Sequence, residues 1–191
     1  MKRMSLAMLM VLGLSTSAFA SWELLNDESS LHYISIKDLN KGELNTFKEL
    51  SGSVSDSGAV SLSVNLRSVD TKIPIRDERM QNELFEVEQF AAATISGNVD
   101  LETAAQLAVG ETYTDTLELT LSLHGVSKEV SSAVRITRLS AGRVLVSSLE
   151  PVIINADEYG LAQGIEKLRN LASLPTISWV VPVTYSLVFQ E

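Results

Sequence analysis

The chain has 191 residues, of which 45% are hydrophobic, and it carries a formal net charge of −9. Because so acidic a chain repels phosphate backbones, nucleic acids are not expected as partners. The sequence has no cysteine, which excludes disulfides, a cysteine nucleophile and a lipid-modified cysteine anchor. The length suits a single domain with a sizeable core.

Residues 1–20 have the pattern of a secretory signal peptide. Lys2 and Arg3 precede an apolar run over residues 4–14, and Ala18-Phe19-Ala20 is a small-x-small cleavage site. The run is shorter than the roughly 20 residues that a membrane-spanning helix needs. We expect cleavage after Ala20, a periplasmic location and no stable membrane anchor. Removal of Lys2 and Arg3 lowers Lys plus Arg from 15 to 13 against 24 acids, so the net charge becomes −11.

The rest of the chain, residues 21–191, alternates apolar and polar residues with the period of β-strands. Closing antiparallel strands into a barrel removes their unpaired edges, so the pattern predicts a mainly β domain formed by one eight-stranded antiparallel barrel. Residues 102–110 are rich in alanine, and a helical turn and a loop both remain open there. The predicted strands cover residues 31–37, 43–54 with a kink near Ser51-Gly52, 60–66, 93–99, 113–123, 130–139, 143–154 and 177–189.

Two helices interrupt this β pattern. Pro74 suits the first position of a helix, and Met80, Leu84 and Val87 then recur at helical spacing, which predicts a helix over residues 74–87. Residues 164–172 show a second helical spacing. We expect both helices to cover the ends of the barrel.

Three blocks of the sequence resemble, in order, the motifs of the YceI-like family. They are the stretch from Ser68-Val69-Asp70-Thr71 through Arg76-Asp77-Glu78-Arg79-Met80 to Ala93-Thr94-Ile95, the stretch Leu119–Lys128 with its His124-Gly125-Val126, and Ile154–Leu161 with its Tyr159-Gly160-Leu161. The resemblance spans residue 22 to the C-terminus. It implies a lipocalin-like antiparallel barrel and, as in some members, an apolar tunnel that binds polyisoprenoid lipids.

The sequence departs from the family pattern at points that concern the lipid head-group rather than the fold. Phe90-Ala91 stands where the family usually has Tyr-Pro, and Arg79 stands where many members carry histidine. Ala156–Tyr159 lacks the basic residue that is common there.

The apolar faces of the strands predict the wall of a tunnel. Eight strands enclose either a packed core or one small ligand; the pattern alone favours a packed core, and the family resemblance favours a tunnel. The predicted wall comprises Ile34, Ile36, Leu62, Val64, Met80, Leu84, Phe85, Phe90, Leu117, Leu119, Leu121, Trp179, Val181 and Tyr185. Trp22 either lines the barrel or closes it.

Arg76 and Arg79 lie one helical turn apart at the predicted mouth of the barrel, where a guanidinium pair can hold a phosphate or a quinone oxygen. The alternative, which the pattern favours, is that they pair with Asp70, Asp77 or Glu83 and fix the helix on the barrel.

The sequence gives little support to catalysis. His32 and His124 are the only histidines and lack the spacing of metal ligands, and His124-Gly125 predicts a turn. No G-x-S-x-G motif is present, and adjacent acids such as Asp77-Glu78 are typical of a solvated surface. We therefore expect no catalytic residue, no metal and no cofactor.

Two functions follow from these observations. The first is an exported, non-enzymatic binding protein that holds a long-chain isoprenoid or a similar amphiphilic lipid. The second is a packed barrel that serves as a scaffold or a stress-associated interaction protein. The oligomeric state stays open, with a homodimer as one alternative.

Overall fold

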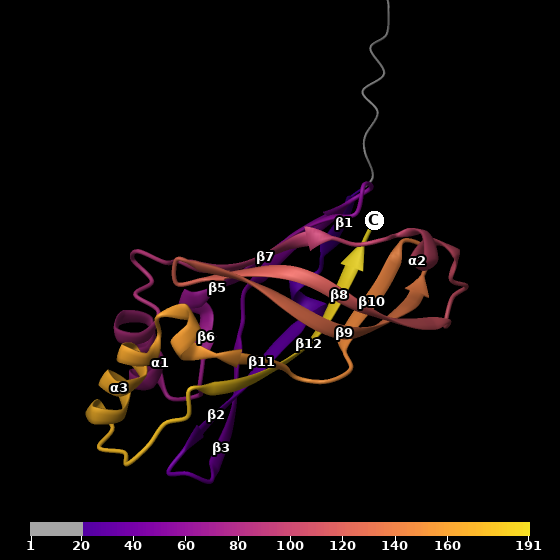
Figure 1. Cartoon of the computed structure of the whole chain (residues 1–191). Coiled ribbons are helices and arrows are strands. Elements are labelled where there is room, and N and C mark those ends of the chain that lie inside the picture. The colour runs from indigo at the N-terminus through magenta and orange to yellow at the C-terminus, as the bar shows by residue number, and fades with distance from the viewer. Residues whose placement is uncertain (1–20) are drawn as a thin grey trace, which may run out of the picture.

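The computed structural model describes residues 21–191, so the predicted signal peptide lies outside the described residues (Figure 1). The described chain forms one antiparallel sheet of twelve strands. The strands are β1 (Ser21–Leu24), β2 (Ser30–Lys37), β3 (Lys41–Phe47), β4 (Leu50–Ser55), β5 (Ala59–Asn65), β6 (Val69–Asp70), β7 (Ala92–Asn98), β8 (Thr112–Leu123), β9 (Val126–Ser140), β10 (Arg143–Ser148), β11 (Val152–Asn155) and β12 (Val180–Gln190).

Eight strands close into a barrel in the order β1-β4-β5-β7-β8-β9-β10-β12, and the pairing of β12 with β1 completes the ring. Leu24 faces Phe189 across this closing pair. Strands β2, β3 and β6 continue the sheet beyond β12, and β11 pairs with the early part of β12. The predicted eight-stranded antiparallel barrel is therefore confirmed, with additional strands.

Two predicted strands are divided. The predicted strand 43–54 is β3 and β4, and the break falls at Lys48-Glu49 rather than near Ser51-Gly52. The predicted strand 143–154 is β10 and β11. The predicted turn at His124-Gly125 joins β8 to β9, and both residues have positive φ, 51° and 78°. A two-residue hairpin of this type fits the twist of the strands, and it favours glycine at such a position.

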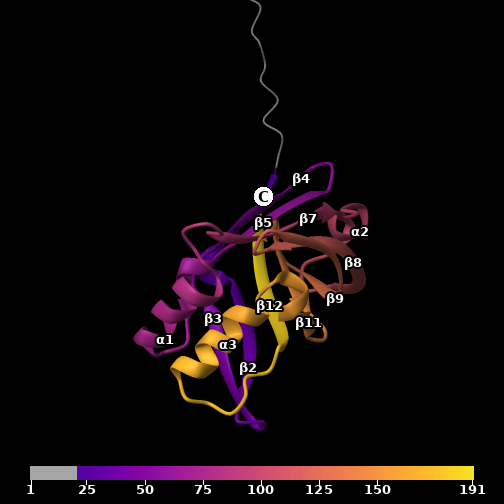
Figure 2. The ribbon, with the colours of Figure 1, turned by 60° about the vertical axis from the view of Figure 1, so that its left-hand side comes forward.

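The described helices lie at the two ends of the barrel. Helix α1 (Pro74–Arg79) continues as a π-helical turn, η3 (Met80–Leu84), and η3 packs with α3 (Ala162–Leu171) at one end; the short helix α2 (Glu102–Gln106) lies at the other (Figures 1 and 2). The predicted helix 74–87 thus ends at Leu84. Short 3₁₀ turns are η1 (Asn26–Glu28), η2 (Leu66–Ser68) and η4 (Ala156–Tyr159).

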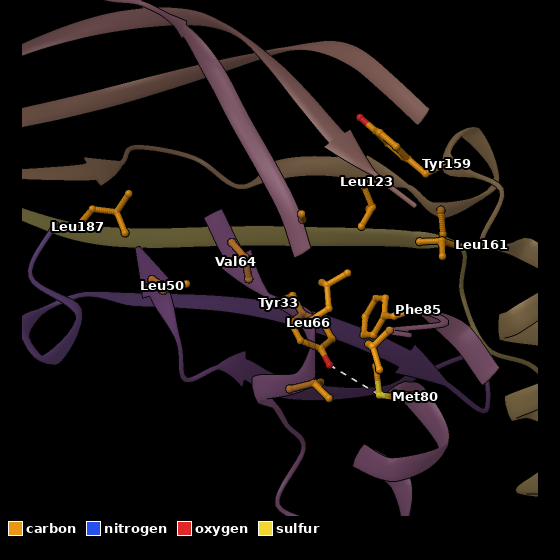
Figure 3. Close-up of a cluster of buried hydrophobic side chains, with 14 of the residues drawn as sticks. Tyr33, Leu50, Val64, Leu66, Met80, Phe85, Leu123, Tyr159, Leu161 and Leu187 are labelled. Carbon is orange, nitrogen blue, oxygen red and sulfur yellow. Dashed lines mark hydrogen bonds between the residues drawn. The ribbon is translucent and has the colours of Figure 1, made fainter. Parts of the chain in front are cut away.

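The π-helical turn supplies buried side chains to the α1–α3 end. Phe85 N–H donates to Met80 O, five residues back, at 2.9 Å, and Met80, Leu84 and Phe85 are all buried. The Phe85 ring lies 5.8 Å from that of Phe47, which in turn lies 5.4 Å from that of Tyr33. Burial raises the pKa of Tyr33 well above its usual range, so its phenol keeps its proton and donates to Met80 Sδ (Figure 3).

No helix within residues 21–191 has the length and apolar character needed to cross a membrane.

Candidate ligand tunnel

The barrel encloses a cavity of about 350 Å³, which lies within the range of small-molecule sites. Alternate residues of the strands form its wall, because successive side chains point to opposite faces. Apolar faces of three strands lie in the wall. They are Val60, Leu62, Val64 and Leu66 around β5, Leu117, Leu119, Leu121 and Leu123 on β8, and Val181, Val183, Tyr185, Leu187 and Phe189 on β12.

The structure brings ten of the fourteen predicted wall residues together around this cavity, and Trp22 joins them. The ten are Leu62, Val64, Met80, Leu84, Phe85, Leu117, Leu119, Leu121, Val181 and Tyr185. The other four, Ile34, Ile36, Phe90 and Trp179, lie outside the wall.

Ile34 and Ile36 lie on the outer face of β2. Leu31 and Tyr33 are the residues of this strand that face the cavity, with Tyr33 opposite Val183 of β12. Ile34 pairs with Leu44 on the outside, where Ile34 is 38% exposed. The prediction chose the wrong face because β2 is apolar on both sides. A shift of one residue moves every side chain to the opposite face.

Phe90 and Trp179 are displaced for different reasons. The Phe90 ring packs on the imidazole of His124, with 4.4 Å between the ring centroids, beside the β8–β9 turn. Trp179 precedes β12 and is 43% exposed. The regular alternation of β12 begins only at Val180, so the phase of the strand does not extend back to Trp179.

The two ends of the cavity differ. At the α1–α3 end its wall consists of buried side chains, including Met80 and Leu84 of η3 and Ile165 of α3. At the other end its wall includes exposed residues of the segment around α2, Asp100 and Ala105. The cavity is thus closed by η3 and α3 and approaches solvent near α2.

Arg76 and Arg79 lie at the closed end and outside the wall, which contradicts their predicted place at a mouth. Arg76 donates to Glu43 of β3 at 2.5 Å and to Thr71 O at 2.8 Å, and Arg79 donates to Leu171 O at 3.4 Å. Neither pairs with Asp70, Asp77 or Glu83 among the described ion pairs, although both tie the helix to its surroundings. Glu43 was not predicted as the partner of Arg76 because the two residues are distant in the sequence.

Glu43 makes the attachment of α1 sensitive to pH. Hydrogen bonds from Lys37 and, secondarily, from Arg76 lower the pKa of Glu43. A carboxylate with a lowered pKa stabilises the fold above its ordinary pKa of about 4.3, and the effect is lost as the pH falls through the folded-state value.

When the pH falls from 7 to 3.5, we expect the free energy of unfolding to decrease less in Glu43→Gln than in the unsubstituted protein. The difference should be at most about 1 kcal/mol, since the ion pairs are partly exposed. Urea unfolding at both pH values measures it, and Glu150→Gln, at an exposed position, is the matched control. Identical pH dependence in the Glu43 and Glu150 variants would contradict the assignment.

One hydrogen-bonded pair lies within the apolar wall. Ser132 of β9, which is 5% exposed, and Tyr185 of β12 are joined through their hydroxyl oxygens at 2.7 Å. Burial raises the pKa of Tyr185, so the phenol stays neutral. Ser132 was not among the predicted wall residues, although its alternation with Val130, Val134 and Ile136 on β9 marks it as inward-facing.

Removing either hydroxyl should leave its partner buried without a hydrogen bond. We expect Tyr185→Phe and Ser132→Ala each to lower the free energy of unfolding by about 1–2 kcal/mol. The double variant should lose less than the sum, because it leaves neither hydroxyl unpaired. Urea unfolding of the four proteins completes the cycle, and additive losses would show that the pair is not coupled.

Within residues 21–191, no three histidine, aspartate or glutamate side chains are grouped as a metal site would require. His124 instead contacts Glu86, with 3.2 Å between Nε2 and Oε2.

Residues 22–189 match the family model described as a YceI-like domain. The chain belongs to the YceI-like family. No curated protein matches the chain.

Solved structures agree with this membership. One is a polyisoprenoid-binding domain from Saccharophagus degradans, implicated in plant cell wall breakdown; it is 40% identical with a TM-score of 0.87, over 89% of this chain and 98% of that one. Another is BcnA of Burkholderia cenocepacia, 16% identical with a TM-score of 0.66 over 86% and 98% of the two chains. A mutant YceI protein of Campylobacter jejuni is 14% identical, with a TM-score of 0.53 over 100% and 99%. The last two show the YceI-like fold alone.

Proposed function

We propose that this protein is an exported, non-enzymatic binding protein that holds a long-chain isoprenoid or a similar amphiphilic lipid inside its barrel. The observation that carries the proposal is the cavity of about 350 Å³ with an almost wholly apolar wall. Transfer of hydrocarbon from water into such a space is favourable by about 0.8 kcal/mol per methylene. The polyisoprenoid-binding description of the 40% identical relative supports the same class of ligand.

The arrangement acts by equilibrium binding. The hydrocarbon chain lies along the cavity with its end towards the side chains of η3 and α3, which close that end. The polar end of the lipid remains near the segment around α2, where the wall reaches solvent. We expect the lipid to enter near α2, because buried side chains of η3 and α3 form the other end of the wall.

Native mass spectrometry of the protein purified from its own host, followed by solvent extraction, tests the proposal. We expect a stoichiometric adduct that is released by solvent and identified as an isoprenoid or a related amphiphile. Recovery of the protein from the periplasmic fraction tests the export.

A protein without an adduct, which also remains without one after incubation with polyprenyl phosphates and quinones, would contradict lipid binding. That result would favour the alternative of a scaffold or stress-associated interaction protein. The cavity supports the binding hypothesis over this alternative, since a scaffold barrel has no need of an apolar space inside it.

A further inference from the structure

Arg138 of β9 lies just beyond the cavity wall, beside the segment that follows α2, where its backbone pairs with Gly110 and Glu111. Ser132 and Ile136 line the cavity, and Arg138, two positions further on, belongs to the same face because side chains alternate along a strand. In the β9–β10 ladder Arg138 is paired with Val144, which is also in the wall. Its Cζ atom lies 5.4 Å from the ring centroid of Trp22, another wall residue.

This guanidinium is without an anionic partner among the described residues. Arg138 makes no ion pair within residues 21–191, and its buried Nη1 atom has no hydrogen-bond acceptor there. The carboxylates of the segment around α2 are engaged locally: Asp100 accepts from Glu102 N at 2.8 Å, and Glu111 accepts from Ala108 N at 2.9 Å. A buried donor without an acceptor is costly, so the site favours a ligand that supplies one.

We propose that Arg138 binds an oxyanion head-group, a phosphate or a carboxylate, at the end of the lipid whose hydrocarbon fills the cavity. The inference rests on the proposed function and moves the head-group from the arginines of α1 to the opposite end of the barrel. The planar fork of N–H donors matches an oxyanion, and stacking on Trp22 holds the fork in place. The acidic surface repels free anions, so a ligand needs both the hydrocarbon and the guanidinium.

Two matched pairs of probes separate the head-group from the hydrocarbon: geranylgeranyl phosphate with geranylgeraniol, and oleate with oleyl alcohol. Their affinities are measured by calorimetry and by the fluorescence of Trp22 in a Trp179→Phe background, which leaves Trp22 as the one tryptophan of the chain. In the unsubstituted protein we expect at least one anion to bind more tightly than its alcohol. The pair that shows the preference distinguishes a phosphate from a carboxylate.

We expect Arg138→Gln to weaken binding of the preferred anion about tenfold or more and to change binding of the matching alcohol less than about twofold. Arg138→Lys should retain part of the preference because it keeps the charge. Arg135→Gln is the control, since this exposed arginine of β9 has the opposite phase and its loss changes the net charge equally.

Three outcomes would overturn the assignment. If Arg138→Gln weakens the binding of the anion and of the alcohol equally and also lowers the melting temperature, Arg138 only stabilises the barrel. If the unsubstituted protein binds anion and alcohol with equal affinity, and Arg138→Gln leaves both affinities unchanged, the head-group site is refuted. Lipid binding itself would then still hold. If the unsubstituted protein binds none of the four probes, the head-group site and the binding of these chains both fail.

Discussion

Leu117→Trp should weaken the binding of geranylgeraniol more than tenfold, because the larger side chain occupies space that the hydrocarbon needs. Leu117 lies in the cavity wall and pairs across the β8–β9 ladder with Ser132, which is also in the wall. Excluding even two methylenes from the cavity forfeits about 1.6 kcal/mol, a factor of more than ten in affinity. Titration calorimetry measures the effect, and denaturant unfolding checks that the variant is folded, with a stability loss of about 1–3 kcal/mol at most.

Ile34→Trp is the matched control for this experiment. It introduces the same large side chain on the outer face of β2, where Ile34 is exposed beside Leu44. Geranylgeraniol should bind this variant as it binds the unsubstituted protein. The reverse result, with binding lost in the Ile34 variant and kept in the Leu117 variant, would place the lipid on the outer apolar surface and not in the barrel.

Gly164→Ala should lower the free energy of unfolding by about 2 kcal/mol or more, although the same change within an exposed helix is stabilising by up to about 1 kcal/mol. Gly164 lies where α3 crosses η3. A Cβ atom at this position would come within 2.7 Å of Glu83 O and 2.8 Å of Leu84 Cα, so one of the two backbones must move. Because the obstacle is backbone, rotation of a side chain cannot relieve it.

This prediction depends on whether Gly164→Ala lowers or raises the free energy of unfolding. Chemical denaturation compares Gly164→Ala with Gln163→Ala, a substitution at the exposed neighbouring position of the same helix. The Gln163 variant should differ from the unsubstituted protein by a few tenths of a kcal/mol. A Gly164 variant more stable than the unsubstituted protein would show that the α3–η3 crossing is looser than described, and that the closed end of the cavity has room to open.

The inward faces of β5, β8 and β12 follow from the sequence, whereas the inward face of β2 does not. In the first three strands, the inward-facing positions are apolar at several successive alternate residues. The outward-facing positions carry polar residues or fewer apolar ones. In β2 both phases hold large apolar residues, so Leu31 and Tyr33 are as plausible as Ile34 and Ile36. The choice was made by the register with β12, which sets Tyr33 opposite Val183.

The sequence predicted that the candidate site is apolar, but it did not predict which end of the cavity is closed. The apolar wall follows from composition and alternation, which are local properties of the chain. Which end is closed depends on long-range packing: η3 and α3 meet there although about 80 residues separate them, and their contact depends on the small size of Gly164. No local pattern marks that contact.

By itself, the sequence determined a closed β-barrel of the YceI-like family with an apolar interior, because strand alternation and short motifs are encoded by neighbouring residues. Only the tertiary structure decided where the charged groups lie relative to the cavity. It pairs Arg76 with Glu43 at the closed end and leaves Arg138 over Trp22 near α2. The physical reason is that the partner of a charge is set by distance in space, and the barrel joins strands that are far apart in the chain.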